Sequence, residues 1–300
     1  MKVLIFGAAG FVGFPVAQAL LRAGHTVYGQ TRTAERANLL ASNEITPIIA
    51  EATDVSAWEF LIADVDVIIE ALAGQTLNTL SPAVFEAVTT AIQKHRPAYA
   101  DKVTFIYTSG AWVWGDDRNK IITDTTAPSK PLSIVAWRPA VEQNILKSEI
   151  VNSVVIRPTL VYGRSSSLLG LAFQRAYEGK LTWPGTPGGR LAVIHQDDLA
   201  DLYVRAAENG PSVKGLSFAA SEDKTESTDD VLAKIAKIAG NQQPFEYTTP
   251  SNPFEEGLGA TVLVRPYLAR AVLGWVPRKH GIVEDLELYY STWKATAGLS

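Results

Sequence analysis

Short runs of apolar residues alternate with helical patterns through the first half of the chain. Each run has the length and the Val and Ile content of a β-strand. The last three are almost continuously apolar, as expected of parallel strands covered on both faces. The pattern therefore predicts an α/β fold around a parallel sheet. The expected strands are Val3–Phe6, His25–Thr31, Ile45–Ala50, Asp64–Ala71, Val103–Thr108 and Ser153–Arg157.

Helical periodicity fills the intervals between these strands. A helical pattern follows the first strand from Pro15 to Ala23. Val84, Phe85 and Val88 share one face of a helix expected over 82–95, with Pro82 in its first turn. A further helix is expected over Leu132–Lys147, between the fifth and sixth strands.

The rhythm changes after Gly163. Ser165–Ser167 and the Pro/Gly-rich Trp183–Gly189 predict loops, and Leu191–His195 predicts a short strand. The remaining helices are expected at Asp197–Glu208, Thr228–Gly240, Val264–Leu273 and Val283–Trp293, with Thr228 as a cap.

The turn after the first strand carries Gly-x-x-Gly-x-x-Gly. Backbone N–H groups at a helix N-terminus bind a pyrophosphate, and glycine lets the phosphate approach the backbone closely. A second strand follows one βαβ unit later, which is the context that a dinucleotide-binding motif requires. The residues expected to hold the cofactor here are Gly7, Gly10, Phe11, Val12 and Gly13.

Two parts of the chain follow from these patterns. Residues 1–163 and 191–225 are expected to form the nucleotide-binding domain. Residues 164–190 and 226–300 are expected to form a smaller, interleaved lobe. The ligand cleft should lie between them, at the carboxyl ends of the strands.

Composition excludes several other classes of function. The 300 residues are 47% hydrophobic and 19% charged, with a net charge of −4, so no basic surplus exists to bind nucleic acid. Cysteine is absent and the four histidines are scattered, so no metal site is expected. No signal peptide and no apolar stretch of about 20 residues is present, which predicts a cytoplasmic protein without a membrane span.

Several segments together resemble the extended short-chain dehydrogenase/reductase superfamily, which includes UDP-galactose epimerases, sugar-nucleotide dehydratases and dihydroflavonol reductases. The glycine motif matches, and four later segments follow in the family order: Phe105–Gly115, Val155–Gly163, Ile194–Ala200 and Leu273–Pro277. They span nearly the whole chain. The resemblance implies a doubly wound parallel Rossmann sheet with a smaller C-terminal substrate lobe.

The proton relay of that family is missing. The family uses a Ser or Thr after strand five and a Tyr-x-x-x-Lys pair on the next helix. These positions match Gly110, Ile134 and Arg138, while the family glutamate matches Glu142. Arg138 could keep the ribose contact of the lysine, but it stays protonated and is a poor proton relay.

The end of the second strand favours NADP. NAD sites usually place an Asp or Glu there, whereas this strand ends at Thr31 and is followed by Arg32 and Arg36. Guanidinium groups suit a 2′-phosphate. The resemblance further places in the cofactor site Glu51, Ala52, Leu72, Ala73, Gly74, Thr108, Pro158, Thr159 and Leu160.

Four tryptophans fall on segments that border the cleft in the resembling family: Trp112, Trp114, Trp137 and Trp183. Tryptophan is also a common core residue, so each has a purely structural alternative. Period-two alternation after strand five would turn Trp112 and Trp114 to the same side as Gly110. With Ile134 they predict a pocket for a flat apolar or aromatic ligand.

Two groups are available to replace the missing proton donor. Ser109 adjoins the lost serine position, and Tyr162 follows the sixth strand at the mouth of the cleft. We therefore expect an NADP(H)-dependent oxidoreductase, monomeric or homodimeric, that acts on a small aromatic or apolar carbonyl or imine-like substrate. Two alternatives stay open: a non-catalytic NADP-binding sensor, and an NAD(P)-dependent epimerase or isomerase.

Overall fold

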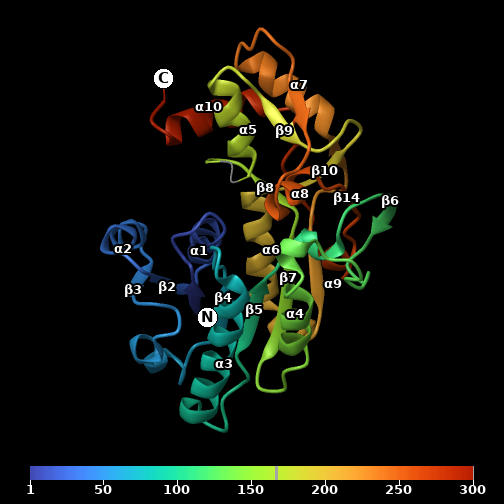
Figure 1. Cartoon of the computed structure of the whole chain (residues 1–300). Coiled ribbons are helices and arrows are strands. Elements are labelled where there is room, and N and C mark those ends of the chain that lie inside the picture. The colour runs from blue at the N-terminus through green and yellow to red at the C-terminus, as the bar shows by residue number, and fades with distance from the viewer. Residues whose placement is uncertain (166–167, 300) are drawn as a thin grey trace.

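A seven-stranded parallel sheet forms the centre of the larger part of the molecule (Figure 1). The computed structural model describes residues 1–165 and 168–299. The strand order is β11-β7-β5-β4-β1-β2-β3. The chain adds strands outward from β1 to β3 on one side and from β4 to β11 on the other, so the order reverses between β1 and β4, as in a doubly wound sheet. The strands are β1 (Lys2–Phe6), β2 (Thr26–Thr31), β3 (Thr46–Ile49), β4 (Val67–Glu70), β5 (Thr104–Thr108), β7 (Asn152–Pro158) and β11 (Ser217–Ala220).

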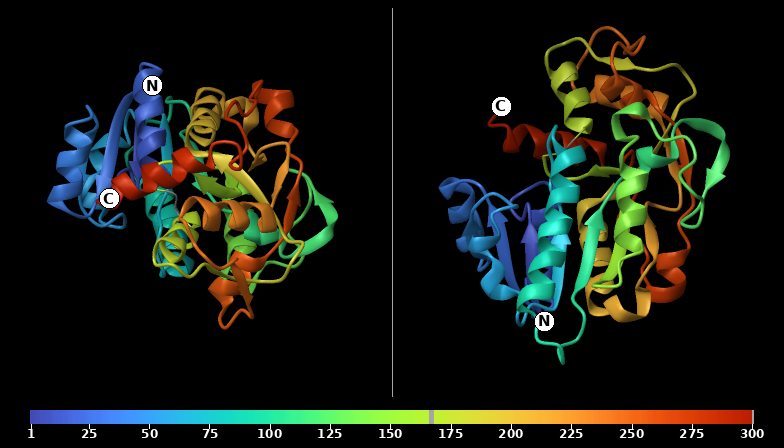
Figure 2. Two further views of the ribbon diagram at one scale, coloured as in Figure 1. Left: turned by 90° about the horizontal axis from the view of Figure 1, so that it is seen from above. Right: turned by 60° about the horizontal axis from the view of Figure 1, so that its bottom comes forward.

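Helices cover both faces of this sheet (Figure 2). α1 (Gly13–Arg22), α2 (Ala34–Ala41) and α6 (Gln196–Glu208) share one core with the sheet residues Val3, Ile5 and Ile69. On the opposite face, α3 (Leu77–His95) and α4 (Arg138–Leu146) pack over Leu4, Phe6 and Phe105. Burial of both faces explains why these strands read as continuous apolar runs.

The smaller lobe lies beyond the carboxyl ends of the strands (Figure 1). Its core is built on Tyr162, Phe173, Trp183 and Trp293. Its helices are α5 (Leu169–Tyr177), α7 (Thr228–Ile238), α8 (Pro253–Gly259) and α10 (Leu286–Thr296). Its strands are β8 (Leu160–Tyr162), β9 (Thr182–Pro184), β10 (Arg190–His195), β12 (Thr225–Ser227) and β13 (Glu246–Thr248).

All six strands expected in the first half are present, with ends shifted by at most three residues. The predicted α/β class and the doubly wound parallel sheet are therefore confirmed. The seventh strand, β11, was not predicted from the sequence. Its short run Ser-Phe-Ala-Ala has little apolar bulk, and its place is set by pairing with β7, with Phe218 opposite Ile156.

Two helices depart from their expected bounds. The helix expected over Leu132–Lys147 is a short 3₁₀ turn, Ser133–Val135, followed by α4 from Arg138. Pro139 cannot donate a hydrogen bond to a preceding carbonyl, so the regular helix starts beside it. α3 begins at Leu77, so Pro82 lies inside the helix and the prediction that it occupies the first turn was wrong.

The C-terminal elements also differ from their expected bounds. Pro266 separates the helix expected over Val264–Leu273 into a strand, β14 (Val262–Val264), and α9 (Leu268–Leu273). β14 pairs with an unpredicted strand, β6 (Asp117–Ile122). Ser227, not Thr228, caps α7 by accepting a hydrogen bond from the N–H of Asp230.

The division of the chain into a nucleotide-binding domain and a lobe stays a prediction, but α9 packs with the large sheet and not with the lobe to which it was assigned. Ala269, Leu273 and Trp275 belong to the core shared by α1, α6 and the large sheet, although they fall in the range expected for the lobe. Of the expected Ser165–Ser167 loop, residues 166–167 lie outside the described residues. In 1–165 and 168–299, no helix combines the length and hydropathy needed to cross a bilayer.

Candidate functional site

The glycine loop lies between β1 and α1, and close backbone contacts at two of its glycines explain its composition. Gly7 has φ +77°, and a Cβ there would lie 2.6 Å from the carbonyl oxygen of Ala71. A Cβ on Gly13 would lie 2.2 Å from the carbonyl oxygen of Gly7. α1 has no side-chain cap and no acidic residue in its first turn. The loop can therefore present its backbone to an anion, as the motif predicts.

The two arginines that follow β2 differ in their contacts with this loop. Arg36 donates through Nη1 to the carbonyl oxygen of Ala9, 3.0 Å away, and Arg32 is exposed. Gln30, buried at the end of β2, accepts from the N–H of Gly7 and donates to the carbonyl oxygen of Ala50. β2 ends at the buried Thr31 and therefore carries no carboxylate at its end. Farther out, Glu51 is exposed and Ala52 is buried.

A cavity of about 900 Å³ opens between the carboxyl ends of the strands and the lobe. Its wall is mainly aliphatic and aromatic, and Arg138 is its one charged side chain among the described residues. Of the residues expected in the cofactor or substrate site, the wall contains Val12, Leu72, Ala73, Gly74, Thr108, Ser109, Gly110, Trp112, Ile134, Trp137, Arg138, Pro158, Thr159, Leu160 and Trp183.

The expected alternation of Trp112 and Trp114 was wrong. After Gly110 the chain forms a 3₁₀ turn, Ala111–Trp114, so successive side chains no longer alternate across a strand. Trp112 lines the cavity, where its ring meets Phe254 edge-on at 6.3 Å between centroids. Trp114 instead is buried outside the cavity wall and donates to the carbonyl oxygen of Thr126.

Arg138 takes a specific position at the base of the cavity. Its guanidinium lies 4.7 Å from the ring centroid of Trp137. Nη1 donates to the hydroxyl of Tyr107 at 3.1 Å and to the carbonyl oxygen of Thr108 at 3.0 Å. These contacts orient a permanent positive charge at the end of β5. Such a charge can hold an anionic or strongly polarised oxygen.

The carboxyl group of Glu70 is buried near Arg138, close enough for the arginine charge to act on it. Glu70, the last residue of β4, accepts a hydrogen bond from Ser81 through Oε1, while its buried Oε2 has no partner among the described residues. Burial raises the pKa of Glu70 to about 7, against the opposing effects of the Ser81 hydrogen bond and the Arg138 charge. Burial also raises the pKa of Tyr107 to about 12.

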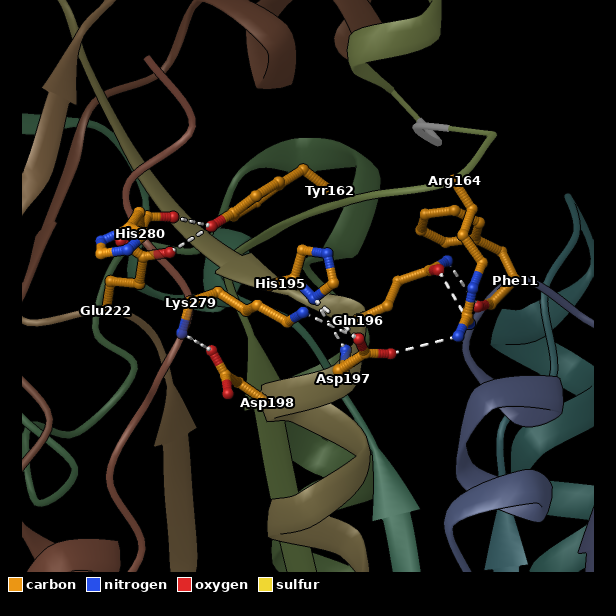
Figure 3. Close-up of polar contacts among 10 residues, drawn as sticks. All are labelled: Phe11, Tyr162, Arg164, His195, Gln196, Asp197, Asp198, Glu222, Lys279 and His280. Carbon is orange, nitrogen blue, oxygen red and sulfur yellow. Dashed lines mark hydrogen bonds and ion pairs between the residues drawn. The ribbon is translucent and has the colours of Figure 1, made fainter. Parts of the chain in front are cut away.

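The two expected proton donors occupy different places. Ser109 belongs to the cavity wall, and its buried hydroxyl has no hydrogen-bond partner in the described structure. Tyr162 is fully buried in the lobe, where its hydroxyl donates to Glu222 at 2.5 Å and lies 2.7 Å from the carbonyl oxygen of His280 (Figure 3). Tyr162 is not part of the cavity wall, because β8 turns its side chain into the lobe core.

Three features of the site were missed in the sequence. Glu70 is the polar end of an apolar strand, and Phe254 and Gly257 lie within 245–260, a segment that the sequence predicts to be rich in loops and that carries no motif. α8 brings Phe254 and Gly257 to the cavity, where a Cβ on Gly257 would lie 2.8 Å from the Trp112 ring. The unusual Glu after Val67-Ile68-Ile69 was the available signal for Glu70. No group of three or more metal-ligating side chains occurs within the described ranges.

Comparison with known proteins agrees with this architecture. The chain is 28% identical over 229 residues to an uncharacterized protein of Schizosaccharomyces pombe, covering 69% of this chain and 71% of that protein. It is 22% identical over 227 residues to a decarboxylating sterol-4-alpha-carboxylate 3-dehydrogenase of Dictyostelium discoideum, covering 70% and 68%.

Two solved structures share the fold over nearly their whole length. The dTDP-glucose 4,6-dehydratase of Bacillus anthracis, in complex with NAD, has a TM-score of 0.81 at 17% identity and 98% and 96% coverage. The UDP-glucuronic acid 4-epimerase of Bacillus cereus, in complex with UDP-glucuronic acid and NAD, has a TM-score of 0.77 at 20% identity and 98% and 99% coverage. A family model matches residues 3–217, and the chain accordingly belongs to the NAD dependent epimerase/dehydratase family.

Proposed function

We propose that this protein is an NADP(H)-dependent oxidoreductase that reduces a carbonyl or imine-like carbon of a small aromatic or apolar compound. The observation that carries the proposal is the wall of the 900 Å³ cavity, which is aromatic and aliphatic around one arginine. Trp112, Trp137 and Trp183 come from three separate segments and all line this cavity. Aromatic side chains of this kind suit a flat apolar ligand.

The glycine loop fits a dinucleotide. The clashes that a Cβ would make at Gly7 and Gly13 leave a bare backbone where a pyrophosphate would lie. Arg32 and Arg36 follow β2, where NAD-specific sites have a carboxylate, and this supports NADP.

The wall is a poor match for a sugar nucleotide, whose diphosphate would require cationic side chains. Arg175 donates instead to the carbonyl oxygen of Thr182, and Arg190 contacts Thr225 through Nε and Nη2. Neither arginine belongs to the cavity wall. Among the described residues, the wall therefore offers Arg138 alone as a cationic side chain, which is fewer than a second diphosphate would require.

The chemistry needs a hydride and a proton. A bound nicotinamide would supply the hydride, and the electron pair of the carbonyl bond would move to oxygen. Arg138 would stabilise the negative charge on that oxygen without losing its own proton. The oxygen then takes a proton from the hydroxyl of Ser109, which water would reprotonate.

Two other functions have specific support. Gly110, Ile134 and Arg138 occupy the three relay positions, which favours a dinucleotide sensor without turnover. Membership of an epimerase/dehydratase family favours epimerisation or a related isomerisation.

One set of measurements separates these functions. NADPH and NADH are titrated by calorimetry, and NADPH is then mixed with a panel of aromatic aldehydes, ketones and imines while the absorbance of the reduced nicotinamide is followed. The proposal expects tighter binding of NADPH, oxidation of NADPH with an aromatic substrate, and no competition from UDP-sugars. Tight NADPH binding without turnover would support the sensor. Conversion of a UDP-sugar would support the epimerase.

A further inference from the structure

Arg138 has hydrogen-bond donors that the protein itself does not use. A guanidinium carries five N–H groups. Nη1 donates to the hydroxyl of Tyr107 and to the carbonyl oxygen of Thr108, which accounts for its two N–H groups. Nε and Nη2 have no hydrogen-bond partner within residues 1–165 and 168–299. The other three donors of this side chain, which belongs to the cavity wall, therefore remain for a ligand.

The positive charge of Arg138 also lacks a counter-ion in the described part of the chain. Other arginines, such as Arg157 and Arg205, form ion pairs, but no described carboxylate lies within 4.0 Å of the Arg138 guanidinium. Glu70 is close enough to feel this charge, but burial raises its pKa to about 7, so it is mostly neutral below that pH. The rings of Trp137 and Tyr107 attract the guanidinium without supplying a negative charge.

A neutral ligand would leave this charge in an unfavourable state. The wall is mainly aliphatic and aromatic, so an apolar ligand that fills the cavity displaces water from the guanidinium. A desolvated cation with unused donors is strongly unfavourable, whereas a carboxylate supplies both the opposite charge and the missing hydrogen bonds. The edge formed by Nε and Nη2 matches the two oxygens of a carboxylate. A ligand that suits the whole wall is therefore apolar and carries one anionic group.

The cavity has free space at Gly110, two residues after the carbonyl group that accepts from Arg138. A Cβ on Gly110 would meet nothing nearer than the carbonyl oxygen of Pro158 at 4.0 Å. Gly110 and Arg138 line the same cavity, so a side chain at position 110 would occupy space that the glycine leaves to a ligand.

We propose that the substrate is an α-keto acid with an aromatic or apolar side chain, and that Nε and Nη2 of Arg138 bind its carboxylate. This inference rests on the proposed function, in which Arg138 also stabilises the charge that develops on the carbonyl oxygen. One guanidinium contacts both groups only where the carboxylate and the carbonyl lie on neighbouring carbons. Two of the unused donors then bind the carboxylate, and the third binds the carbonyl oxygen.

Reduction of such a substrate gives an α-hydroxy acid. Hydride adds to the keto carbon, the electron pair of the carbonyl bond moves to oxygen, and that oxygen takes a proton, while NADPH is oxidised to NADP⁺. The carboxylate stays unchanged and serves only to hold the substrate on Arg138.

The binding test uses phenylacetate and phenylacetamide, which have nearly the same size, differ in charge and lack a reducible keto group. Each is titrated by calorimetry into the wild-type protein, Arg138→Met and Lys147→Met, with saturating NADPH. Lys147→Met is the matched control, because it removes the same charge from an exposed position at the C-terminal end of α4, outside the cavity wall.

The wild-type protein and Lys147→Met should bind phenylacetate at least about tenfold more tightly than phenylacetamide, the size expected of a charge-assisted hydrogen bond. Arg138→Met should remove this preference. Arg138→Lys, which keeps the charge but loses the planar pair of donors, should retain part of it. In a second measurement, NADPH oxidation is followed with phenylpyruvate and with phenylacetone, in which a methyl group replaces the carboxylate. Phenylpyruvate should have the larger kcat/KM.

Equal affinities of the wild-type protein for phenylacetate and phenylacetamide would overturn the proposal without recourse to any variant. A preference that Arg138→Met leaves unchanged would overturn it too, and a simultaneous loss of NADPH affinity would assign the arginine to the cofactor. Equal kcat/KM for phenylpyruvate and phenylacetone would overturn it while the proposed function stood. If no carbonyl compound oxidised NADPH, the proposed function would fall, and the calorimetric preference, measured without cofactor, would still decide whether Arg138 binds a carboxylate.

Discussion

Arg157 of β7 and Glu142 of α4 form an ion pair in the interior, with Nη2 2.7 Å from Oε2 and Nε also directed at the carboxylate. Their side chains are 3% and 0% exposed. The pair attaches α4 to the sheet. Since Arg138 is the first residue of α4, this ion pair also positions the side chain that is the one charged group of the cavity wall within 1–165 and 168–299.

Removal of one partner of this pair should destabilise the fold strongly. We expect Glu142→Ala to lower the free energy of unfolding by about 3–5 kcal/mol, because it leaves the Arg157 guanidinium buried and unpaired. Urea unfolding measures the change. The double variant Glu142→Leu/Arg157→Met is the control and should lose clearly less. A loss below about 1 kcal/mol in Glu142→Ala, typical of an exposed pair, would contradict the prediction.

Arg32 should distinguish the two cofactors. Arg32→Ala removes a guanidinium expected at the 2′-phosphate, so NADPH binding should weaken by about 1.5–3 kcal/mol while NADH binding barely changes. Calorimetric titration with each cofactor measures the difference. Equal losses for NADPH and NADH would show that Arg32 does not read the 2′-phosphate.

An added methyl group should be tolerated at one glycine of the site and should destabilise the protein at another. A Cβ on Gly110 would meet nothing nearer than the carbonyl oxygen of Pro158 at 4.0 Å, so Gly110→Ala should leave the melting temperature nearly unchanged. A Cβ on Gly13 would lie 2.2 Å from a backbone oxygen, so Gly13→Ala should cost about 1–3 kcal/mol of stability and disturb cofactor binding. Thermal unfolding of the two variants tests the contrast, which equal melting temperatures would refute.

The two tryptophans after β5 should have separate roles. Trp112→Ala should weaken binding of aromatic compounds by about 1–3 kcal/mol through lost contact area. Trp114→Ala should act mainly on stability, at about 3–5 kcal/mol, because its ring packs beneath the Arg157 guanidinium at 5.1 Å. Quenching of tryptophan fluorescence and urea unfolding measure the two effects. A larger effect of Trp114→Ala on binding than on stability would contradict this assignment.

The raised pKa of Glu70 should make stability depend on pH. The folded protein keeps the Glu70 proton up to about pH 7, whereas the unfolded chain loses it near 4.5. Stability is therefore greatest below the unfolded value and falls as pH rises through about 7. The total effect is up to about 3 kcal/mol.

Glu70→Gln should flatten this dependence and raise stability at pH 8 relative to the wild-type protein. The glutamine keeps a hydrogen-bond acceptor for Ser81 and carries no charge to desolvate. Urea unfolding of both proteins, measured at intervals of about one pH unit between pH 5 and pH 8, provides the test. Parallel pH profiles for the two proteins would mean that Glu70 does not titrate in this range.

Local patterns were sufficient for the frame of the fold. Periodicity and the glycine motif located six of the strands of the large sheet and the turn after β1, because parallel strands must be apolar on both faces and a phosphate loop must lack side chains. The missing Ser-Tyr-Lys relay was also readable, since Gly110, Ile134 and Arg138 are identities rather than contacts.

Tertiary packing alone decided the rest of the site. The 3₁₀ turn at 111–114 separated Trp112 from Trp114, and α8 supplied Phe254 from more than a hundred residues away. Packing of α3 and α4 on the sheet enclosed Glu70. These relationships depend on the distances between segments remote in sequence. Local periodicity carries information about the face of an element, and it carries none about which distant side chain that face will meet.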